Sequence, residues 1–178
     1  MDGANVSVRD IVSSVIFYAG MILLSLLLLR VGTRYSMEKV HEDFRGMEPR
    51  LQRGSHIFLN KTLRQPDQLS YDDIIMYKRP AWKRASYAYE LARVLGKPGD
   101  LVEMRDRRLY RAERRDGKLG PLQLVNEPYV DPRDIPTDFS AFAVPRNTIF
   151  VMQDDRDRRE SLRNLLVPVR SIAGRMIR

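Results

Sequence analysis

The stretch LARVLGKPGDLVEM, residues 91–104, decides the fold class of this 178-residue chain. It contains two short apolar runs, at 91–95 and 101–104, with the turn residues Gly96, Pro98, Gly99 and Asp100 between them. Apolar runs of this length that are bounded by glycine, proline and aspartate are typical of β-strands joined by a turn. The stretch therefore predicts two strands and a connecting turn.

The same pattern continues on both sides of this stretch. Further apolar runs lie at 56–59, 73–77 and 148–152, and turn sequences lie at 116–117, 126–128 and 144–145. Short runs at this spacing predict a mainly β domain, which we place at residues 44–178. Four prolines fall between positions 121 and 136, so we interpret residues 105–143 as a hairpin or loop excursion from that domain.

The N-terminal part of the chain predicts a transmembrane helix. After a short leader at 1–10, residues 11–29 contain no charged side chain, and Arg30 closes the segment. At about 1.5 Å per residue, a helix of this length crosses the ~30 Å hydrocarbon core of a bilayer. A cleaved signal peptide fits less well, because the leader carries two acidic residues and the sequence RVGT at 30–33 is a poor cleavage site. We therefore expect a membrane anchor at 11–30 and a polar connector with a helical turn at 31–43.

The charges next to this segment bear on its orientation. Arg9 stands before the helix, whereas Arg30, Arg34, Lys39 and Arg45 follow it. Counted strictly, the positive-inside rule keeps the large domain in the cytoplasm. Long domains can be translocated despite such charges, so the count alone does not decide the side.

The net charge of +8 favours an anionic neighbour, either a lipid surface or a nucleic acid. The arginines alternate with acids, as at 105–108 and 154–160, and do not form one basic run. This pattern favours a solvated surface. We expect membrane lipid as a partner, and we do not expect nucleic acid.

Several classes of site are excluded or unsupported by composition. The chain has no cysteine, which excludes disulfides, thiolate ligands and a cysteine nucleophile. It has no dinucleotide-binding or phosphate-binding glycine motif and no HExxH sequence. Its two histidines, His41 and His56, have no cluster of ligand residues beside them. We therefore predict no cofactor and no metal.

A series of segments resembles the type I signal peptidases. MEPRLQRG at 47–54 resembles the end of their box SMxPTLxxGD, RVLGKPGDLV at 93–102 resembles KRVIGLPGDxV, and FVMQDDRD at 150–157 resembles FVMGDNRD. Weaker matches to other segments of that family lie in the same order, at 59–61, 71–77, 109–110, 125–130 and 167–175. The resemblance covers residues 44–178, behind an apolar segment placed where that family has its anchor.

The resemblance implies a signal-peptidase-type antiparallel β domain outside the cytoplasm. It also implies cleavage of signal peptides by a serine whose proton is taken by a lysine. A lysine can act as that base only if desolvation lowers its pKa. Because large translocated domains are the cases in which the charge rule fails, we give the family order more weight than the flanking arginines.

The chain departs from the family pattern where the chemistry should lie. In this alignment the nucleophilic serine falls on Gly46, and the lysine falls on Ala92. A small or hydroxylic residue near the nucleophile, which donates to the oxyanion in some members, falls on Phe44. Neither glycine nor alanine can attack a peptide or accept a proton. The sequence therefore predicts a member that has lost its serine–lysine dyad.

Three functional hypotheses remain open. The first is a catalytically inactive homologue that binds a signal-peptide-bearing or other extended polypeptide, or an active signal peptidase. Its groove would include Phe44, Met47, Pro49, Leu91 and Arg93. The second is an active membrane-bound serine endopeptidase that uses a displaced pair drawn from Ser36, Ser55 and Lys97. The third is a membrane-tethered basic module with no peptide groove.

Overall fold

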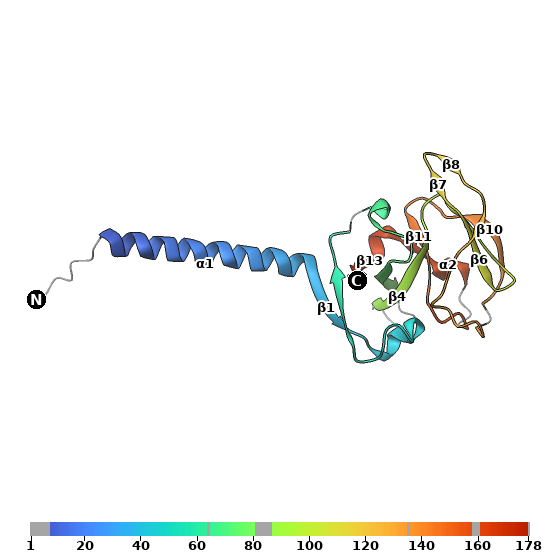
Figure 1. Cartoon of the computed structure of the whole chain (residues 1–178), viewed down its shortest axis with the longest axis horizontal. Helices are drawn as coiled ribbons and strands as arrows, with labels where there is room; N and C mark the ends of the chain where they lie inside the picture. The colour runs from blue at the N-terminus through green and yellow to red at the C-terminus, as the bar shows by residue number, and fades with distance from the viewer. Residues whose placement is uncertain (1–7, 64, 81–86, 135, 158–160, 178) are drawn as a thin grey trace, which may run out of the picture.

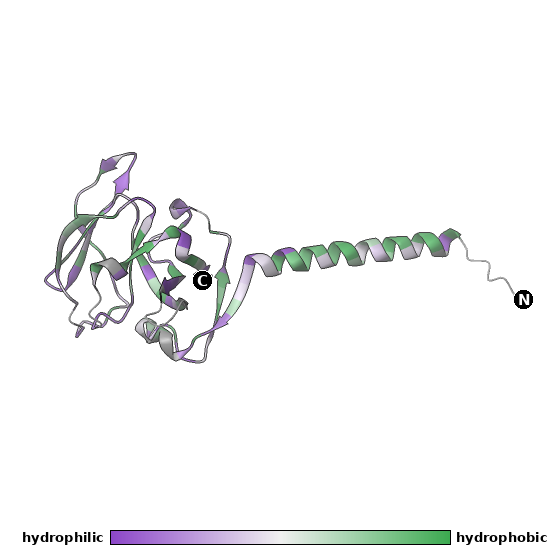
Figure 2. Cartoon of the chain, turned by 180° about the vertical axis from the view of Figure 1, so that it is seen from behind, coloured by the Kyte–Doolittle hydropathy of each residue, from purple (hydrophilic) through white to green (hydrophobic). Residues whose placement is uncertain are grey.

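The computed structural model describes residues 8–63, 65–80, 87–134, 136–157 and 161–177. Helix α1, Val8–Arg34, projects away from a β domain that holds the other elements (Figure 1). Apolar residues follow one another along the length of α1 (Figure 2), and none of its membrane-spanning window is buried against the domain. The segment Ile11–Arg34 is therefore long and apolar enough to cross a membrane.

The connector expected at 31–43 is helical at its two ends and a strand in its middle. The helix continues to Arg34, and the next residues form strand β1, Tyr35–Lys39, which pairs with strand β2, His56–Asn60. In β1 the half-buried residues Ser36 and Glu38 alternate with exposed ones. This two-residue period suits a strand with one face on the domain. The helical part of the connector therefore lies outside β1, in residues 31–34 of α1 and at the start of η1, Glu42–Met47.

Most of the domain is built on a seven-stranded antiparallel sheet with the order β1-β2-β13-β3-β4-β11-β12. The longest strand is β4, Tyr87–Gly96, which pairs with β3, Ile74–Pro80, along one side. The remaining bounds are β11 Thr148–Met152, β12 Leu166–Pro168 and β13 Ile172–Met176. Short helical segments connect these strands: η1 Glu42–Met47, η2 Pro66–Gln68, α2 Leu162–Leu165 and η3 Val169–Ser171.

A second sheet occupies much of the region that we interpreted as an excursion. It has four strands in the order β10-β5-β6-β9, at the end of the domain away from α1 (Figure 1). Their bounds are β5 Leu101–Arg105, β6 Arg108–Ala112, β9 Gln123–Leu124 and β10 Phe139–Ala143. The small hairpin of β7, Arg114–Arg115, and β8, Lys118–Leu119, lies beside it. Residues 105–143 therefore contribute strands β6, β9 and β10 to this sheet. Leu109 and Ala112 of β6 are buried, so this region also takes part in the core.

The turn between β4 and β5 joins the two sheets. Strand β4 ends at Gly96 and β5 begins at Leu101, and Gly99 has φ of +88°, which favours glycine. The buried Asp100 carboxylate accepts hydrogen bonds from the Lys97 and Arg114 backbone N–H groups, at 2.7 and 2.8 Å. It also accepts one from the Tyr71 hydroxyl, at 2.8 Å. These contacts explain why glycine and aspartate occupy the turn between the two strands.

Three apolar clusters form the core. One lies under η1 and includes Met47, Leu59 and Leu91. A second contains residues from β3, β4 and β11, among them Ala92. A third, which includes Val102 and Phe150, joins the second sheet to the end of β11 and to α2. The chain around position 46 is therefore held between the first cluster and the end of β11.

Candidate functional site

Gly46 lies in η1, on a segment that is fixed by its neighbours. The side chains of Phe44 and Met47, on either side of it, are 6% and 0% exposed and pack in the same cluster as Leu91 of β4. The Gly46 carbonyl accepts a hydrogen bond of 2.9 Å from the Asp155 backbone N–H. The loop that corresponds to the peptidase box is thus tied to the core below it and to the chain that follows β11.

The space beside Gly46 is filled by Gln153. A Cβ atom added to Gly46 in ideal geometry would lie 1.9 Å from Gln153 Oε1, 2.3 Å from its Cδ and 3.0 Å from its Cβ. Gln153 itself is 6% exposed. The sequence carried a signal for this contact that our prediction missed: the family box FVMGD has glycine where this chain has Gln153.

Ala92 lies on strand β4, next to Leu91, which packs against η1. It is 1% exposed and packs in an apolar cluster with Ile75, Val94 and Val151. In the pairing of β4 with β11, Val94 is opposite Val151, and Arg93 is opposite Met152. The pairing ends at this step, and Ala92 and Gln153 are the next residues beyond it on the two segments. Gly46 and Gln153 are therefore brought together directly, and Ala92 lies on the strand that packs against η1 and pairs with β11.

Most of the predicted groove residues support the loop from beneath. Phe44, Met47, Leu91 and Arg93 are all buried, and only Pro49 of the five is exposed. The buried side chains cannot line a surface that a peptide would touch. The groove therefore stays a prediction about the backbone and the exposed residues of these segments.

Arg93 instead belongs to a buried ion pair. Its Nε donates to Asp154 Oδ1 at 2.8 Å, and its Nη2 donates to Asp154 Oδ2, with both side chains only 1% exposed. Its Nη1 donates to the Asp72 carbonyl at 3.1 Å, and its guanidinium lies 3.7 Å from the centre of the Tyr129 ring. Burial alone would lower the pKa of Arg93, but the hydrogen bonds to Asp154 raise it. Arg93 therefore stays charged and holds Asp154 in place.

The residues after Asp154 are held in a similar way. The buried Arg156 guanidinium pairs with the Glu127 carboxylate, and the Arg156 backbone N–H donates to Asp134 at 2.9 Å. The Tyr129 hydroxyl donates to Asp72 Oδ1 at 3.1 Å, and burial raises the pKa of Tyr129. Residues 154–156 are thus fixed by polar contacts on both sides of Asp155.

The substitutes considered for the dyad lie in separate parts of the domain. Ser36 is on β1, opposite Leu59, and its hydroxyl has no hydrogen-bond partner among the described residues. Ser55 is exposed and donates to the Gln52 carbonyl at 2.6 Å. Lys97 lies beyond the end of β4, with its ammonium 4.8 Å from the centre of the Tyr71 ring. Three strands separate β1 from β4 in the sheet, so these contacts do not join Ser36 to Lys97.

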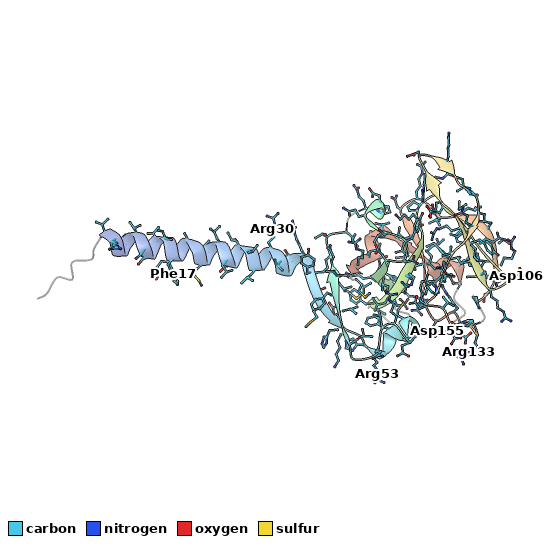
Figure 3. The ribbon with its side chains drawn as sticks, viewed as in Figure 1. Phe17, Arg30, Arg53, Asp106, Arg133 and Asp155 are labelled. Carbon is cyan, nitrogen blue, oxygen red and sulfur yellow. The ribbon has the colours of Figure 1, made fainter. Side chains whose placement is uncertain are left out.

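One group of carboxylates in the described part of the chain has spacing that could suit a cation. Oxygens of Asp134, Asp155 and Asp157 lie within 4.8 Å of one another. Figure 3 places Asp155 and Arg133 at the same edge of the β domain. Two of these carboxylates already accept backbone hydrogen bonds, Asp134 from Arg156 and Asp155 from Asp157. These bonds give the group a role in fixing the loop, and the expectation of no metal stays a prediction.

A cavity of about 260 Å³ adjoins the candidate site. Met152, Gln153 and Arg156 line it from the end of β11, and Phe139 and Leu165 line it from β10 and α2. Gln153 therefore borders this cavity and also fills the space beside Gly46.

The chain is similar to known signal peptidases over most of its length. A family model described as "Signal peptidase, peptidase S26" matches residues 13–177. Signal peptidase I of Bacillus licheniformis is 31% identical over 139 residues, which are 72% of this chain and 68% of that protein. Signal peptidase I T of Bacillus subtilis is 28% identical over 144 residues, which are 76% of this chain and 68% of that protein. A crystal structure of a signal peptidase I from Enterococcus faecalis aligns with a TM-score of 0.45 and 24% identity, covering 64% of this chain and 97% of that one.

Proposed function

Because this chain belongs to the signal peptidase family, peptidase S26, we propose that it is a membrane-anchored member that does not cleave peptides. In this proposal α1 anchors the protein, and the β domain lies on the extracytoplasmic side. The domain binds a signal-peptide-bearing or other extended polypeptide, or a partner such as an active signal peptidase, without cutting it.

One observation supports the proposed inactive state: in the match to the family boxes, the positions of the nucleophile and the base fall on Gly46 and Ala92. Gly46 has no side chain, and Ala92 offers only a methyl group, surrounded by Ile75, Val94 and Val151. Such an apolar environment would lower the pKa of a lysine, as this chemistry requires. The apolar surroundings of Ala92 therefore support position 92 as the family's base position, which carries a methyl group in this chain. Residues that act as a unit fail together, so the loss of both should remove most of the rate acceleration.

The pairing of β4 supports a binding role. Among the described residues, Arg93, Val94 and Gly96 pair with β11, whereas 87–92 pair only with β3. The first half of β4 therefore has a side without a strand partner among the described residues, and its Leu91 packs against η1. An extended peptide can add to such a side through its backbone, because main-chain hydrogen bonds do not depend on a catalytic group. Tyr89, which is 41% exposed on this half of β4, could contact the side chains of such a peptide.

The first test is cleavage. Purified full-length protein in detergent is incubated with a signal-peptide-bearing preprotein, with an active signal peptidase as the positive control, and the products are read by mass spectrometry. We expect no specific cleavage. Specific cleavage that is lost in Ser36→Ala, Ser55→Ala or Lys97→Ala would contradict the proposal and support a displaced pair.

The second test is binding. A photo-crosslinking residue placed at Tyr89 should capture the preprotein, whereas the same group at Leu119, an equally exposed position on β8, should not. Equal capture at both positions, or capture at neither, would contradict binding at β4. Capture at neither position would favour a tethered module with no peptide groove.

A further inference from the structure

We propose that Gln153 closes the candidate site, and that Gly46 and Gln153 form a dependent pair in which a side chain at one position excludes the side chain at the other. The role that we assign to Gln153 is steric and does not require a ligand. It deepens the proposed function, and rests on it only in taking position 46 as the place of the nucleophile.

The first step of the argument is the overlap. The 1.9 Å between the added Gly46 Cβ and Gln153 Oε1, and the 2.3 Å to its Cδ, are far below any real contact between these atoms. The amide group lies at the free end of a flexible side chain and could in principle turn away. Gln153 Cβ, however, lies 3.0 Å from the added atom and does not move when the amide turns. A side chain at position 46 therefore also presses on the Gln153 backbone.

The second step is that this backbone is fixed. Asp154 is held by the buried Arg93 guanidinium, and the Asp155 N–H donates to the carbonyl of Gly46 itself. The hydrogen bond from Asp155 keeps the two segments together at their closest point. Separating them would break this hydrogen bond and strain the ion pair, because both belong to the residues directly after Gln153.

The third step is the effect on packing. Gln153 is 6% exposed and borders the cavity of about 260 Å³, so its removal would leave more empty space beside Gly46. Overpacked and underpacked interiors are both less stable than a filled one. With serine at 46 and glutamine at 153, the space between the two segments would be overpacked. With glycine at both positions, the same space would be underpacked. Serine at 46 with glycine at 153 would again fit, and this is the combination in the family boxes that the chain resembles.

A stability cycle tests the pair without any substrate. Melting temperatures are measured by circular dichroism for the full-length wild type, G46S, Q153G and G46S/Q153G. We expect G46S to lower the melting temperature by roughly 3–9 °C in the wild-type background and to cause no loss in the Q153G background. The milder G46A replaces G46S if the latter does not fold. G32S is the matched control, since nothing lies within 4 Å of a Cβ on Gly32.

Accessibility gives an independent measure, because the chain contains no cysteine. The single cysteine of G46C should react slowly with a maleimide, and at least about tenfold faster in G46C/Q153G. The exposed position of S55C sets the fast reference. Equal labelling rates with and without Gln153, or an equal loss of melting temperature from G46S in both backgrounds, would overturn the proposal. Neither measurement uses a peptide. Their results therefore test the Gly46–Gln153 pair alone, and the cleavage and crosslinking experiments test the proposed function.

Discussion

Neutralising Asp154 should destabilise the β domain strongly. In the Asp154→Asn variant the side chain keeps its shape and loses its charge, while Arg93 stays charged because burial does not prevent its protonation. Both side chains are 1% exposed, so water cannot replace the lost partner. Removal of one partner from a buried pair of this kind costs about 3–5 kcal/mol. For a chain of this size that corresponds to a fall of about 6–20 °C in melting temperature.

The structure supports the upper part of that range. Asp154 accepts two hydrogen bonds from Arg93, and the same guanidinium also donates to the Asp72 carbonyl and lies on the Tyr129 ring. A change at Asp154 therefore disturbs the segments that carry Asp72 and Tyr129. Replacement of both partners by apolar residues, in Arg93→Met/Asp154→Leu, removes the unpaired charge. This double variant should recover much of the stability that Asp154→Asn loses.

The assay is thermal and urea unfolding of the full-length protein in detergent, followed by circular dichroism. Asp131→Asn is the matched control, because the Asp131–Arg133 pair has the same chemistry but is exposed and should leave the melting temperature unchanged. A loss below about 1 kcal/mol for Asp154→Asn would refute the reasoning, because the ion pair would then behave as a surface pair. A double variant less stable than Asp154→Asn would refute it as well.

Three further predictions follow from other parts of the chain. Leu91→Ala, at a fully buried position under η1, should lower the free energy of unfolding by about 2–5 kcal/mol, whereas truncation of the exposed Leu119 to alanine should change it little. The hydrogen bonds from Arg133 hold the pKa of Asp131 at about 2, below its usual value. A carboxyl titration followed by NMR should therefore show an Asp131 midpoint that rises in Arg133→Ala, and an unchanged midpoint would contradict the pairing. Leu23→Arg/Leu24→Arg, at the centre of α1, should shift the protein toward the carbonate-extractable fraction, and full retention in the membrane would argue against a spanning helix.

The sequence predicted the fold well where local patterns and tertiary packing agree. The stretch at 91–104 forms strands β4 and β5 around the expected turn, because Gly99 and Asp100 serve the turn directly. The apolar segment from residue 11 forms one helix, which extends to Arg34. Strand β1 was missed because its five residues are polar or exposed in part, and only the pairing with β2 makes them a strand.

Contacts between distant segments limited the prediction of the site. Gly46 and Gln153 are more than 100 residues apart, and a single sequence gives no direct sign that they touch. The substitution of glutamine in the FVMGD box was visible, but its meaning depends on the distance to Gly46. In the same way, the resemblance placed Phe44, Met47 and Leu91 near a groove, whereas their burial follows from how η1 packs on β4. Residue types near the site could therefore be predicted, and their contacts could not.

The most direct test of the central claim measures binding and cleavage in one sample. Full-length protein in nanodiscs is mixed with a signal-peptide-bearing preprotein, complex formation is followed by size-exclusion chromatography, and the bound preprotein is then analysed by intact-mass spectrometry. We predict a complex in which the preprotein keeps its full mass over times at which an active signal peptidase processes all of it. A preprotein shortened at its signal-peptide junction would contradict the account.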